Sequence, residues 1–292
     1  MSNITKMTLC GNAKLNLYLD ITGRRNDGYH LLETVMQSID LCDIITVKLA
    51  DGVDGISVQT SNPLIPSGRR NICTKAAEMF FSAAGKKMPV EIYIDKRIPH
   101  AAGLGGGSAD AAAVLTALNV MLGNPMGENE LIKLAARVGA DVPFCLCGGI
   151  KACFGIGDEL SDMSPFPEVF YLVIMPDFYC DTHGAYVEYD DAPLPRYCGM
   201  SKFIKSGEGF PKRMYNVFKQ LYDNESINAI VNRLSALGAE GANLSGSGSA
   251  VFGVFKDEKT AREAAAEFPK YFTAVCKPVN KGIITVDSDT IN

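Results

Sequence analysis

The residues best suited to bind a phosphate group lie between Ile98 and Ala113, in the segment IPHAAGLGGGSADAAA. Its glycines can adopt positive φ and let an anion approach the backbone amides without a Cβ in the way. Apolar residues then recur at helical spacing, which predicts a buried helix whose free N–H groups face the glycines. We expect Ser108 at the N-cap of this helix and Asp110 in its first turn. A helix end of this kind attracts phosphate, so the sequence predicts an anion-binding loop.

This loop does not by itself identify its ligand. It lacks the G-x-x-x-x-G-K-[ST] spacing of a P-loop, and it lacks the context of a dinucleotide fingerprint. A flexible connection in front of a helix is an alternative, because glycine-rich turns are common between elements. The segment favours a nucleotide and leaves its kind open.

Polar side chains on a predicted strand and beside a proline are further candidates for chemistry. From Thr8 to Asp20 the sequence alternates, and Lys14 and Asn16 fall two residues apart on the polar face. They would lie side by side over whatever this strand faces, and a solvated edge strand is an equal alternative. Asp141 precedes Val142-Pro143, so it is either a free carboxylate beside an extended or turned segment or the N-cap of a short helix.

Two turns could add binding groups. The pair Asp27-Gly28 favours a tight reversal and leaves Tyr29 and His30 at the start of the next strand. A single histidine is more often a surface or core group than a functional one. A second glycine-serine turn, SGSGS at residues 245–249, separates two predicted strands, and a surface hairpin tip is the alternative.

Composition and charge limit the class of protein. A chain of 292 residues with 47% hydrophobic content can bury a large core, and its length suggests two lobes, which we place at 1–160 and 161–292. The net charge of -5 and the scattered basic pairs argue against a nucleic-acid partner. With no apolar signal core and no segment long enough to cross a bilayer, we expect a cytoplasmic protein without a membrane partner. The sequence does not define an oligomeric state.

The nine cysteines are spread along the chain, most of them in apolar surroundings, and we interpret them as reduced core thiols. The pair Cys145-x-Cys147 has no second pair or histidine nearby to complete a zinc site. The sequence therefore predicts no structural metal.

Hydrophobic periodicity predicts the elements that must position these groups. Between the N-terminal strand and residue 160, strands are predicted at 34–39, 43–49, 56–60 and 90–95, and helices at 71–84, at the alanine run and at 128–138. Beyond it, strands are predicted at 171–175, 242–244, 250–255 and 273–278, and helices from 182 and at 258–268. This mixture predicts an α+β protein.

Three separated segments together resemble the GHMP kinases: NAKLNLYLDITGRRNDGYH, IPHAAGLGGGSADAA and NLSGSGSAVFGVF. Within this family, the motifs AKLNL, G-R-x-x-D-G-Y-H and GADVPF resemble those of the branch that acts on cytidine diphosphate-linked methylerythritol. The resemblance covers most of the chain. It implies a two-lobed GHMP kinase fold, with an N-terminal ribosomal S5 domain 2-like lobe, a C-terminal ferredoxin-like lobe and an active site between them.

The resemblance also implies roles for particular residues. Lys14 and Asp141 match the two catalytic positions of the family. Positions that bind the substrate are matched by Asn16, Tyr29, His30, Thr182 and Tyr186. Positions that bind ATP are matched by Asn71, Lys96, Pro99, His100, Ala101, Ala102, Gly103, Leu104, Gly105, Gly106, Gly107, Ser108 and Ala109. Mg²⁺ is implied together with ATP, without a dedicated protein ligand. Asp181 departs from the pattern, because it stands where relatives often have serine.

Two other functions fit parts of the sequence. A GHMP kinase could act on another small alcohol, such as mevalonate, homoserine or a sugar, but the Tyr29-His30 pair suits a nucleobase better. A nucleotide-binding regulator without activity would keep the loop, but it would have no need for both Lys14 and Asp141. Both alternatives predict ATP binding, so only turnover separates them from the kinase named by the resemblance.

Overall fold

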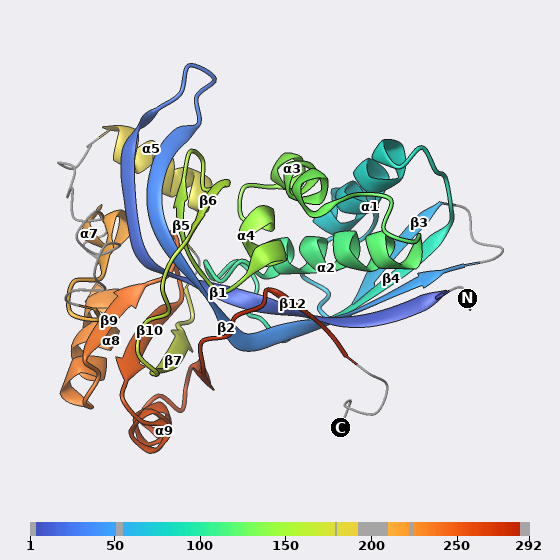
Figure 1. Ribbon diagram of the computed structural model, residues 1–292. Helices are drawn as coiled ribbons and strands as arrows, with labels where there is room; N and C mark the ends of the chain where they lie inside the picture. Colours follow the sequence, from blue (N-terminus) through green and yellow to red (C-terminus); the bar gives the residue numbers. More distant parts are fainter. Residues whose placement is uncertain (1–3, 51–54, 179, 192–209, 222–224, 287–292) are drawn as a thin grey trace.

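A long antiparallel hairpin of β1 (Lys6–Arg24) and β2 (His30–Leu49) runs through the whole molecule (Figure 1). The computed structural model describes residues 4–50, 55–178, 180–191, 210–221 and 225–286. The pairing of the two strands shifts between Asn12 and Lys14, between Asn16 and Tyr18, and between Ile21 and Gly23. Such bulges bend and twist a hairpin, and they carry its two ends into different parts of the protein.

The other strands complete two sheets. Their bounds are β3 (Ile56–Thr60), β4 (Val90–Asp95), β5 (Ile150–Phe154), β6 (Glu159–Asp162), β7 (Phe170–Met175), β8 (Tyr215–Asn216), β9 (Gly241–Leu244), β10 (Val251–Phe255), β11 (Phe272–Cys276) and β12 (Ile283–Thr285). The larger sheet has the order β12-β1-β2-β4-β3, with β5 and β6 added beside β2 and β8 beside β1. The smaller sheet has the order β11-β7-β10-β9 and is antiparallel throughout.

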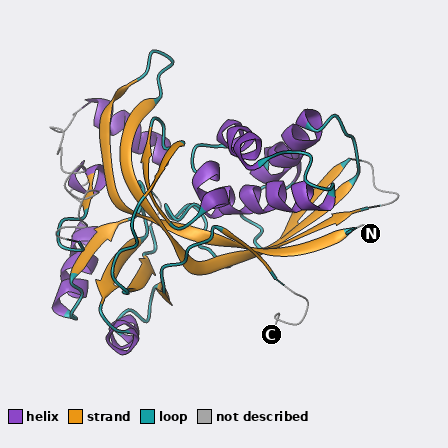
Figure 2. Ribbon diagram, in the orientation of Figure 1, coloured by secondary structure: helices purple, strands orange, loops and turns teal. Residues whose placement is uncertain are grey.

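Helices cover one face of the larger sheet and pack against the smaller one (Figure 2). Their bounds are η1 (Gly68–Arg70), α1 (Ile72–Ala83), α2 (Gly106–Met121), α3 (Glu128–Val138), α4 (Val142–Cys147), α5 (Thr182–Asp191), α7 (Val217–Leu221), α8 (Glu225–Ala236) and α9 (Glu258–Ala266). The alanine-rich α2 lies at the centre of the hydrophobic core beside the larger sheet, between that sheet and helices α1, α3 and α4. Across the described residues, no helix combines the length and apolar character needed to cross a membrane.

Helix α2 begins earlier than the sequence suggested. Its N-cap is Gly105, at φ 71°, and Gly106 and Gly107 already belong to the helix. Both Ser108 and Asp110 therefore lie deeper in the helix than predicted, and the expected cap at Ser108 is wrong. The reason is steric: Gly105 can adopt a left-handed conformation, so the chain turns into the helix there without a side-chain cap.

Most predicted elements are present, and the α+β class is confirmed. Predicted strands 34–39 and 43–49 are parts of one strand, β2, because the irregular pairing continues through the residues between them. The division at residue 160 stays a prediction: β6 crosses it, and β8 and β12 come from the second half of the chain but join the larger sheet.

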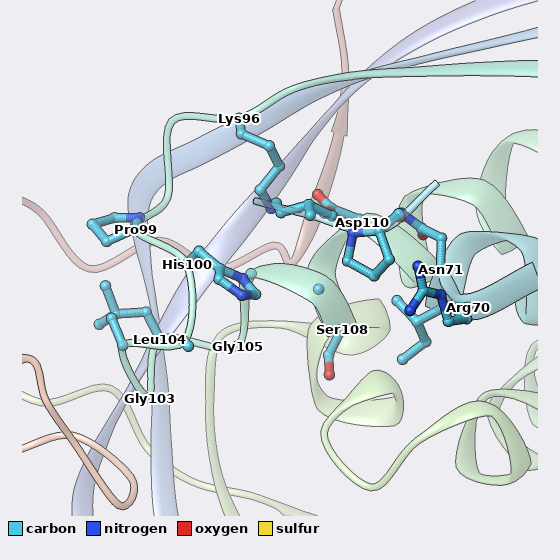
Figure 3. A pocket seen from close by; sticks show the side chains of 17 residues that line it. Arg70, Asn71, Lys96, Pro99, His100, Gly103, Leu104, Gly105, Ser108 and Asp110 are labelled. Carbon is cyan, nitrogen blue, oxygen red and sulfur yellow. The ribbon is translucent and has the colours of Figure 1, made fainter. Parts of the chain in front are cut away.

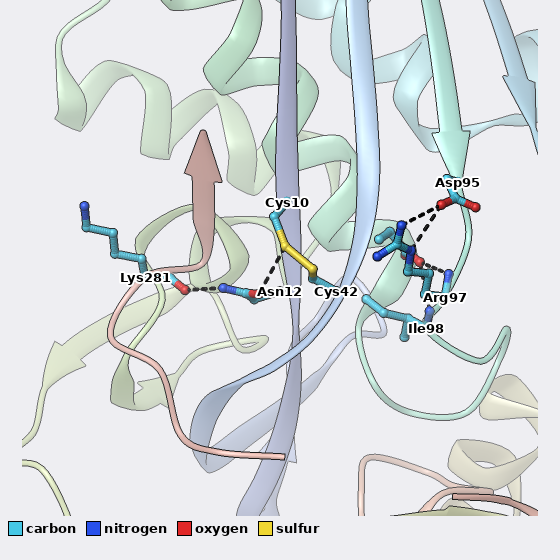
Figure 4. The surroundings of a disulfide bond; sticks show 8 residues. Cys10, Asn12, Cys42, Asp95, Arg97, Ile98 and Lys281 are labelled. Carbon is cyan, nitrogen blue, oxygen red and sulfur yellow. Dashed lines mark hydrogen bonds and ion pairs between the residues drawn. A yellow bond between two sulfur atoms is a disulfide. The ribbon is translucent and has the colours of Figure 1, made fainter. Parts of the chain in front are cut away.

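The cysteine interpretation is wrong at two positions, because Cys10 and Cys42 form a disulfide (Figure 4). They lie on adjacent strands, where Asn12 pairs with Cys42, and their Cα atoms are 5.7 Å apart. The register that brings them together could not be read from a separation of 32 residues. The other cysteines in the described part of the chain are free. Cys198 lies outside the described residues.

Candidate active site

The glycine loop borders a cavity of about 360 Å³ (Figure 3). This cavity is lined by Asn71, Lys96 and every residue from Pro99 to Ser108, together with Ile65, Pro66, Arg70, Ile72 and Asp110. Ala109, also predicted to bind ATP, is fully buried and does not line it. The free N–H groups of the first turn of α2 belong to this part of the chain. The cavity therefore combines a helix N-terminus with a glycine-rich wall, as an anion site requires.

Two glycines in the loop are required by close contacts. Gly103 has φ 75°, and a Cβ there would overlap the backbone carbonyl of Ser245 in the second glycine-serine turn. Gly105 has φ 71°, and a Cβ there would lie 2.8 Å from Cγ of Lys14. The loop thus passes directly between that turn and the lysine of β1, and only glycine allows this approach.

Hydrogen bonds fix the loop through its carbonyl groups. The amide of Lys14 donates to the carbonyl of Leu104 at 2.9 Å, and the amide of Ala250 donates to that of Ala102 at 3.1 Å. The Ser245 hydroxyl donates to the carbonyl of Gly103 at 2.9 Å. Because these bonds come from β1 and from the turn before β10, both sheets determine the position of the loop.

Lys14 and Asp141 come together beside the loop. The ammonium Nζ of Lys14 lies 3.5 Å from Oδ2 of Asp141 and donates to Oδ1 of Asn16 at 2.5 Å. Asn16 in turn donates to Thr34 at 2.8 Å, so its oxygen is held towards the lysine. The Lys14 side chain is 5% exposed and that of Asp141 is 35% exposed. Although Asp141 precedes α4, its carboxylate makes no capping hydrogen bond and is available for chemistry.

These residues line a second cavity of about 150 Å³, which adjoins the first at Gly103 and Gly105. Its other wall contains Thr182 and Ser247, whose hydroxyl oxygens are 2.9 Å apart. Asn216 holds the turn of Ser247 in place, because its side-chain amide donates to the carbonyls of Leu244 and Gly246 at 2.8 Å each. The second glycine-serine turn therefore lines this cavity and is not only a surface hairpin tip.

A third cavity, of about 830 Å³, adjoins the second at Asp141, Thr182 and Tyr186. It is also lined by Tyr29 and His30, so the structure gathers the predicted substrate residues around two connected cavities. Tyr29 is 62% exposed, so its ring is accessible from this cavity.

No sequence pattern indicated Asp190, which also lines this third cavity. Its Oδ1 lies 2.7 Å from Nε2 of His30, and its Oδ2 lies 3.0 Å from Nη1 of Arg24. The hydrogen bond with His30, together with the nearby charges, lowers the pKa of Asp190. The His30 ring also stacks on Tyr186, with ring centroids 4.7 Å apart. His30 is thus held against α5 by Asp190 and Tyr186, a contact across 160 residues for which the sequence has no local signal.

Two residues expected to contact ligands, Asn71 and Lys96, have side chains that are already engaged, and so does Asp181. The Asn71 side chain accepts from the amide of Cys73 and donates to the carbonyl of Pro66, each at 2.9 Å. The ammonium of Lys96 is held by two carboxylates. Asp181, the residue that departs from the family pattern, accepts from the amide of His183 at 3.1 Å at the start of α5. The Asp181 carboxylate therefore stabilises the first turn of α5, at the position where the sequence departs from the serine of the family pattern.

The fold and the site define the class of protein. Residues 71–149 match the GHMP kinases N terminal domain, and residues 222–274 match the GHMP kinases C terminal domain. A crystal structure of homoserine kinase from Cytophaga hutchinsonii has the same fold, with a TM-score of 0.73 at 16% identity, covering 98% of this chain and 99% of that one. These matches confirm the predicted two-lobed GHMP kinase fold.

Relatives with higher sequence identity show which family of GHMP kinases the chain belongs to. The chain is 37% identical over 276 residues to 4-diphosphocytidyl-2-C-methyl-D-erythritol kinase of Clostridium tetani, covering 92% of this chain and 98% of that one. It is 39% identical over 266 residues to the kinase of the same name from Caldicellulosiruptor saccharolyticus, covering 89% and 91%. A crystal structure of 4-(cytidine 5'-diphospho)-2C-methyl-D-erythritol kinase matches with a TM-score of 0.75 at 32% identity, covering 93% and 99%. The chain belongs to the 4-diphosphocytidyl-2-C-methyl-D-erythritol kinase family.

Proposed function

We propose that the protein transfers the γ-phosphoryl group of ATP to a hydroxyl of 4-diphosphocytidyl-2-C-methyl-D-erythritol, giving the 2-phosphate and ADP in non-mevalonate isoprenoid precursor biosynthesis. The observation that carries the proposal is the position of the Lys14–Asp141 pair. It lies between the cavity of the glycine loop and the larger cavity of Tyr29 and His30. Relatives named for this kinase activity match almost the whole chain, which supports the same reaction.

The ATP phosphates are expected to bind at the glycine loop, where backbone amides and the N-terminus of α2 favour negative charge. The engaged side chains of Asn71 and Lys96 are expected to shape the nucleoside end of this cavity without offering their polar groups. Mg²⁺ typically binds through substrate phosphates, one or two protein oxygens and water. The described residues contain no group of three or more His, Cys, Asp or Glu that could hold an ion. They fit an ion carried by the triphosphate, with the Ser108 hydroxyl as a candidate contact.

Lys14 would stabilise the charge that develops on the transferred phosphoryl group. Phosphoryl transfer depends mainly on positioning and charge stabilisation, since the protein has little covalent chemistry to perform. A positive charge about 4 Å from a unit negative charge contributes about 4 kcal/mol at an effective dielectric constant of 20. Lys14 is almost fully buried and held by Asn16, so it would need little reorganisation to act.

Asp141 would orient the acceptor hydroxyl and accept its proton. Its carboxylate lines both the second and the third cavity, and the ammonium of Lys14, 3.5 Å away, holds it in place. In a loose transition state the hydroxyl proton leaves late, so orientation contributes together with proton transfer.

The third cavity would hold the cytidine end of the acceptor. Its volume of about 830 Å³ suits a nucleotide-sized ligand. Tyr29 and Tyr186 supply aromatic surface for the base, and His30 supplies a polar group that Asp190 orients. Thr182 and Ser247 supply hydroxyls where the diphosphate would approach the catalytic pair. In this scheme residues 1–160 bind ATP and contain the catalytic pair, and residues 161–292 complete the acceptor site.

The decisive experiment is turnover with ATP, magnesium and 4-diphosphocytidyl-2-C-methyl-D-erythritol, followed by ADP release and by the mass of the product. Parallel reactions should contain mevalonate, homoserine and galactose as acceptors. We expect turnover with the cytidine compound alone. Turnover with another alcohol instead would assign the protein to a different branch of the GHMP kinases. ATP binding without turnover on any acceptor would support the alternative that the protein is a nucleotide-binding regulator without activity.

A further inference from the structure

A cluster of three buried charged side chains lies beneath the glycine loop. It consists of Asp43 on β2, Lys96 just after β4 and Asp110 on α2, with side chains that are 0%, 3% and 4% exposed. Lys96 and Asp110 also line the cavity assigned to ATP (Figure 3). Neither the catalytic scheme nor the hydrophobic core accounts for the burial of three ionisable groups at this place, because burying charge is costly unless it is paired.

Asp43 anchors the segment that leads into the loop. Its Oδ1 accepts from the backbone amides of Arg97 at 2.6 Å and Ile98 at 2.8 Å, and its Oδ2 accepts from Nζ of Lys96. A carboxylate that accepts several hydrogen bonds in a buried site holds its donors firmly. Figure 4 shows Arg97 and Ile98 close to the Cys10–Cys42 disulfide that joins β1 and β2. The start of the loop is therefore attached to the rigid hairpin.

Lys96 connects this anchor to the helix on the other side of the loop. Its ammonium donates to Oδ2 of Asp110 at 2.7 Å as well as to Asp43. A Cβ added at Gly106 would lie 3.3 Å from Nζ, so the ammonium packs directly against the first residue of α2. Together the three side chains join the strand before the loop to the helix after it.

The charges of the cluster balance within it. Burial raises the pKa of Asp110 to about 8, with Lys96 opposing the rise and Asp43 adding to it. Burial alone would lower the pKa of Lys96, but the carboxylates of Asp110 and Asp43 outweigh it and raise that pKa. The ammonium of Lys96 is thus held inside the protein by the two carboxylates.

We infer that Asp43 is a positioning residue of the ATP site, which fixes the start of the glycine loop through the amides of Arg97 and Ile98, and that Lys96 is the counter-ion of this carboxylate and does not touch the nucleotide. This inference rests on the proposed ATP site and goes beyond it, because it assigns the buried lysine an internal role. A lysine beside a phosphate loop would ordinarily be expected to bind phosphate directly. The two roles predict opposite results when both charges are removed together.

The test compares Lys96→Met, Asp43→Asn/Lys96→Met and Asp43→Ala/Lys96→Met. ATP affinity is measured by calorimetry without acceptor, and KM for ATP and for the acceptor are measured by ADP release. Lys96→Met leaves the carboxylate of Asp43 buried without a counter-charge, so ATP affinity should fall at least about tenfold through displacement of the loop. KM for the acceptor should change little. Lys48 is an exposed lysine on β2, the strand that carries Asp43, so Lys48→Met is the matched control and should leave both values unchanged.

The double variants decide between the two roles. Asp43→Asn/Lys96→Met removes both charges, yet its amide oxygen can still accept from Arg97 and Ile98, so it should recover ATP affinity to within about threefold of the wild type. Asp43→Ala/Lys96→Met leaves those two amides unpaired and should remain weak. Thermal unfolding shows which variants fold, and the asparagine double variant is informative even if Lys96→Met alone does not fold.

Weak ATP binding by the folded Asp43→Asn/Lys96→Met variant would overturn the inference and make Lys96 a direct nucleotide contact. Equal affinity of the two double variants would also overturn it, because the amide contacts of Asp43 would then have no effect on the loop. If the wild-type protein did not bind ATP, the proposed function itself would be wrong. This result differs from the two above, because in both of them the wild-type protein binds ATP.

Discussion

Replacing Gly103 by alanine should displace the glycine loop from the second glycine-serine turn. The new Cβ would overlap the carbonyl oxygen of Ser245 and lie 3.1 Å from that of Gly248. An ordinary C···O contact is about 3.3 Å, so the two backbones would have to separate by roughly 1 Å. A misplacement of about 1 Å near a reacting centre can cost about 10²-fold in rate. We therefore expect kcat/KM for ATP to fall by about 10²-fold.

The same substitution also places alanine at a φ of 75°, which costs about 1–2 kcal/mol in the folded state. Gly123→Ala separates this strain from the steric clash. Gly123 has φ 80°, and nothing lies within 4 Å of the position of its Cβ. Gly123→Ala should lower the free energy of unfolding by a similar amount and leave kcat/KM unchanged.

Both variants are compared with the wild type by coupled ADP release and by urea unfolding. A kcat/KM for Gly103→Ala within about twofold of the wild type would refute the reasoning, because the loop would then tolerate the shift that the clash imposes. An equal loss of activity in Gly123→Ala would also refute it. In that case general destabilisation, and not the position of the loop, would explain the effect.

Other residues of the site give further predictions. Lys14→Met and Asp141→Asn should each lower kcat by about 10²-fold or more in the ADP-release assay, and turnover near the wild-type value would remove that residue from the mechanism. Tyr29→Ala should raise KM for the cytidine substrate far more than KM for ATP; equal increases would exclude a stacking role. Asp190→Asn should raise the same KM, because it weakens the contact that holds His30 in place. An unchanged KM would show that the histidine does not depend on this carboxylate.

Local patterns in the sequence predicted the elements and the glycine loop, because both depend on residues close together in the chain. The strand predicted at 90–95 is β4, and the helix predicted at 128–138 is α3. The start of α2 was predicted too late, because Ser108 looked like a cap and the left-handed Gly105 performs that function. The pair of Lys14 and Asp141 was inferred from the family resemblance, and the structure brings the two side chains to 3.5 Å.

The supporting residues could not be predicted in the same way. Asp43 is the first residue of the strand predicted at 43–49, and its partner Lys96 is 53 residues away. Asp190 lies near the end of α5, and its partner His30 is 160 residues away. Neither carboxylate belongs to a local motif, because its function depends on the pairing of distant elements. Such residues become visible only when burial and hydrogen-bond partners are known.

The glycine loop is held from two sides, and this makes the ATP site a property of the whole molecule. On one side, Asp43 fixes the amides that lead into the loop. On the other side, Ser245 and Ala250 donate to its carbonyls from the turn before β10. Residues 1–160 contain the loop, α2, Lys14 and Asp141, yet without the second half of the chain the carbonyls of Ala102 and Gly103 would lose these donors. The same turn also carries Ser247 into the catalytic cavity. A change that moved this turn would therefore alter the binding of the phosphoryl donor and the acceptor together.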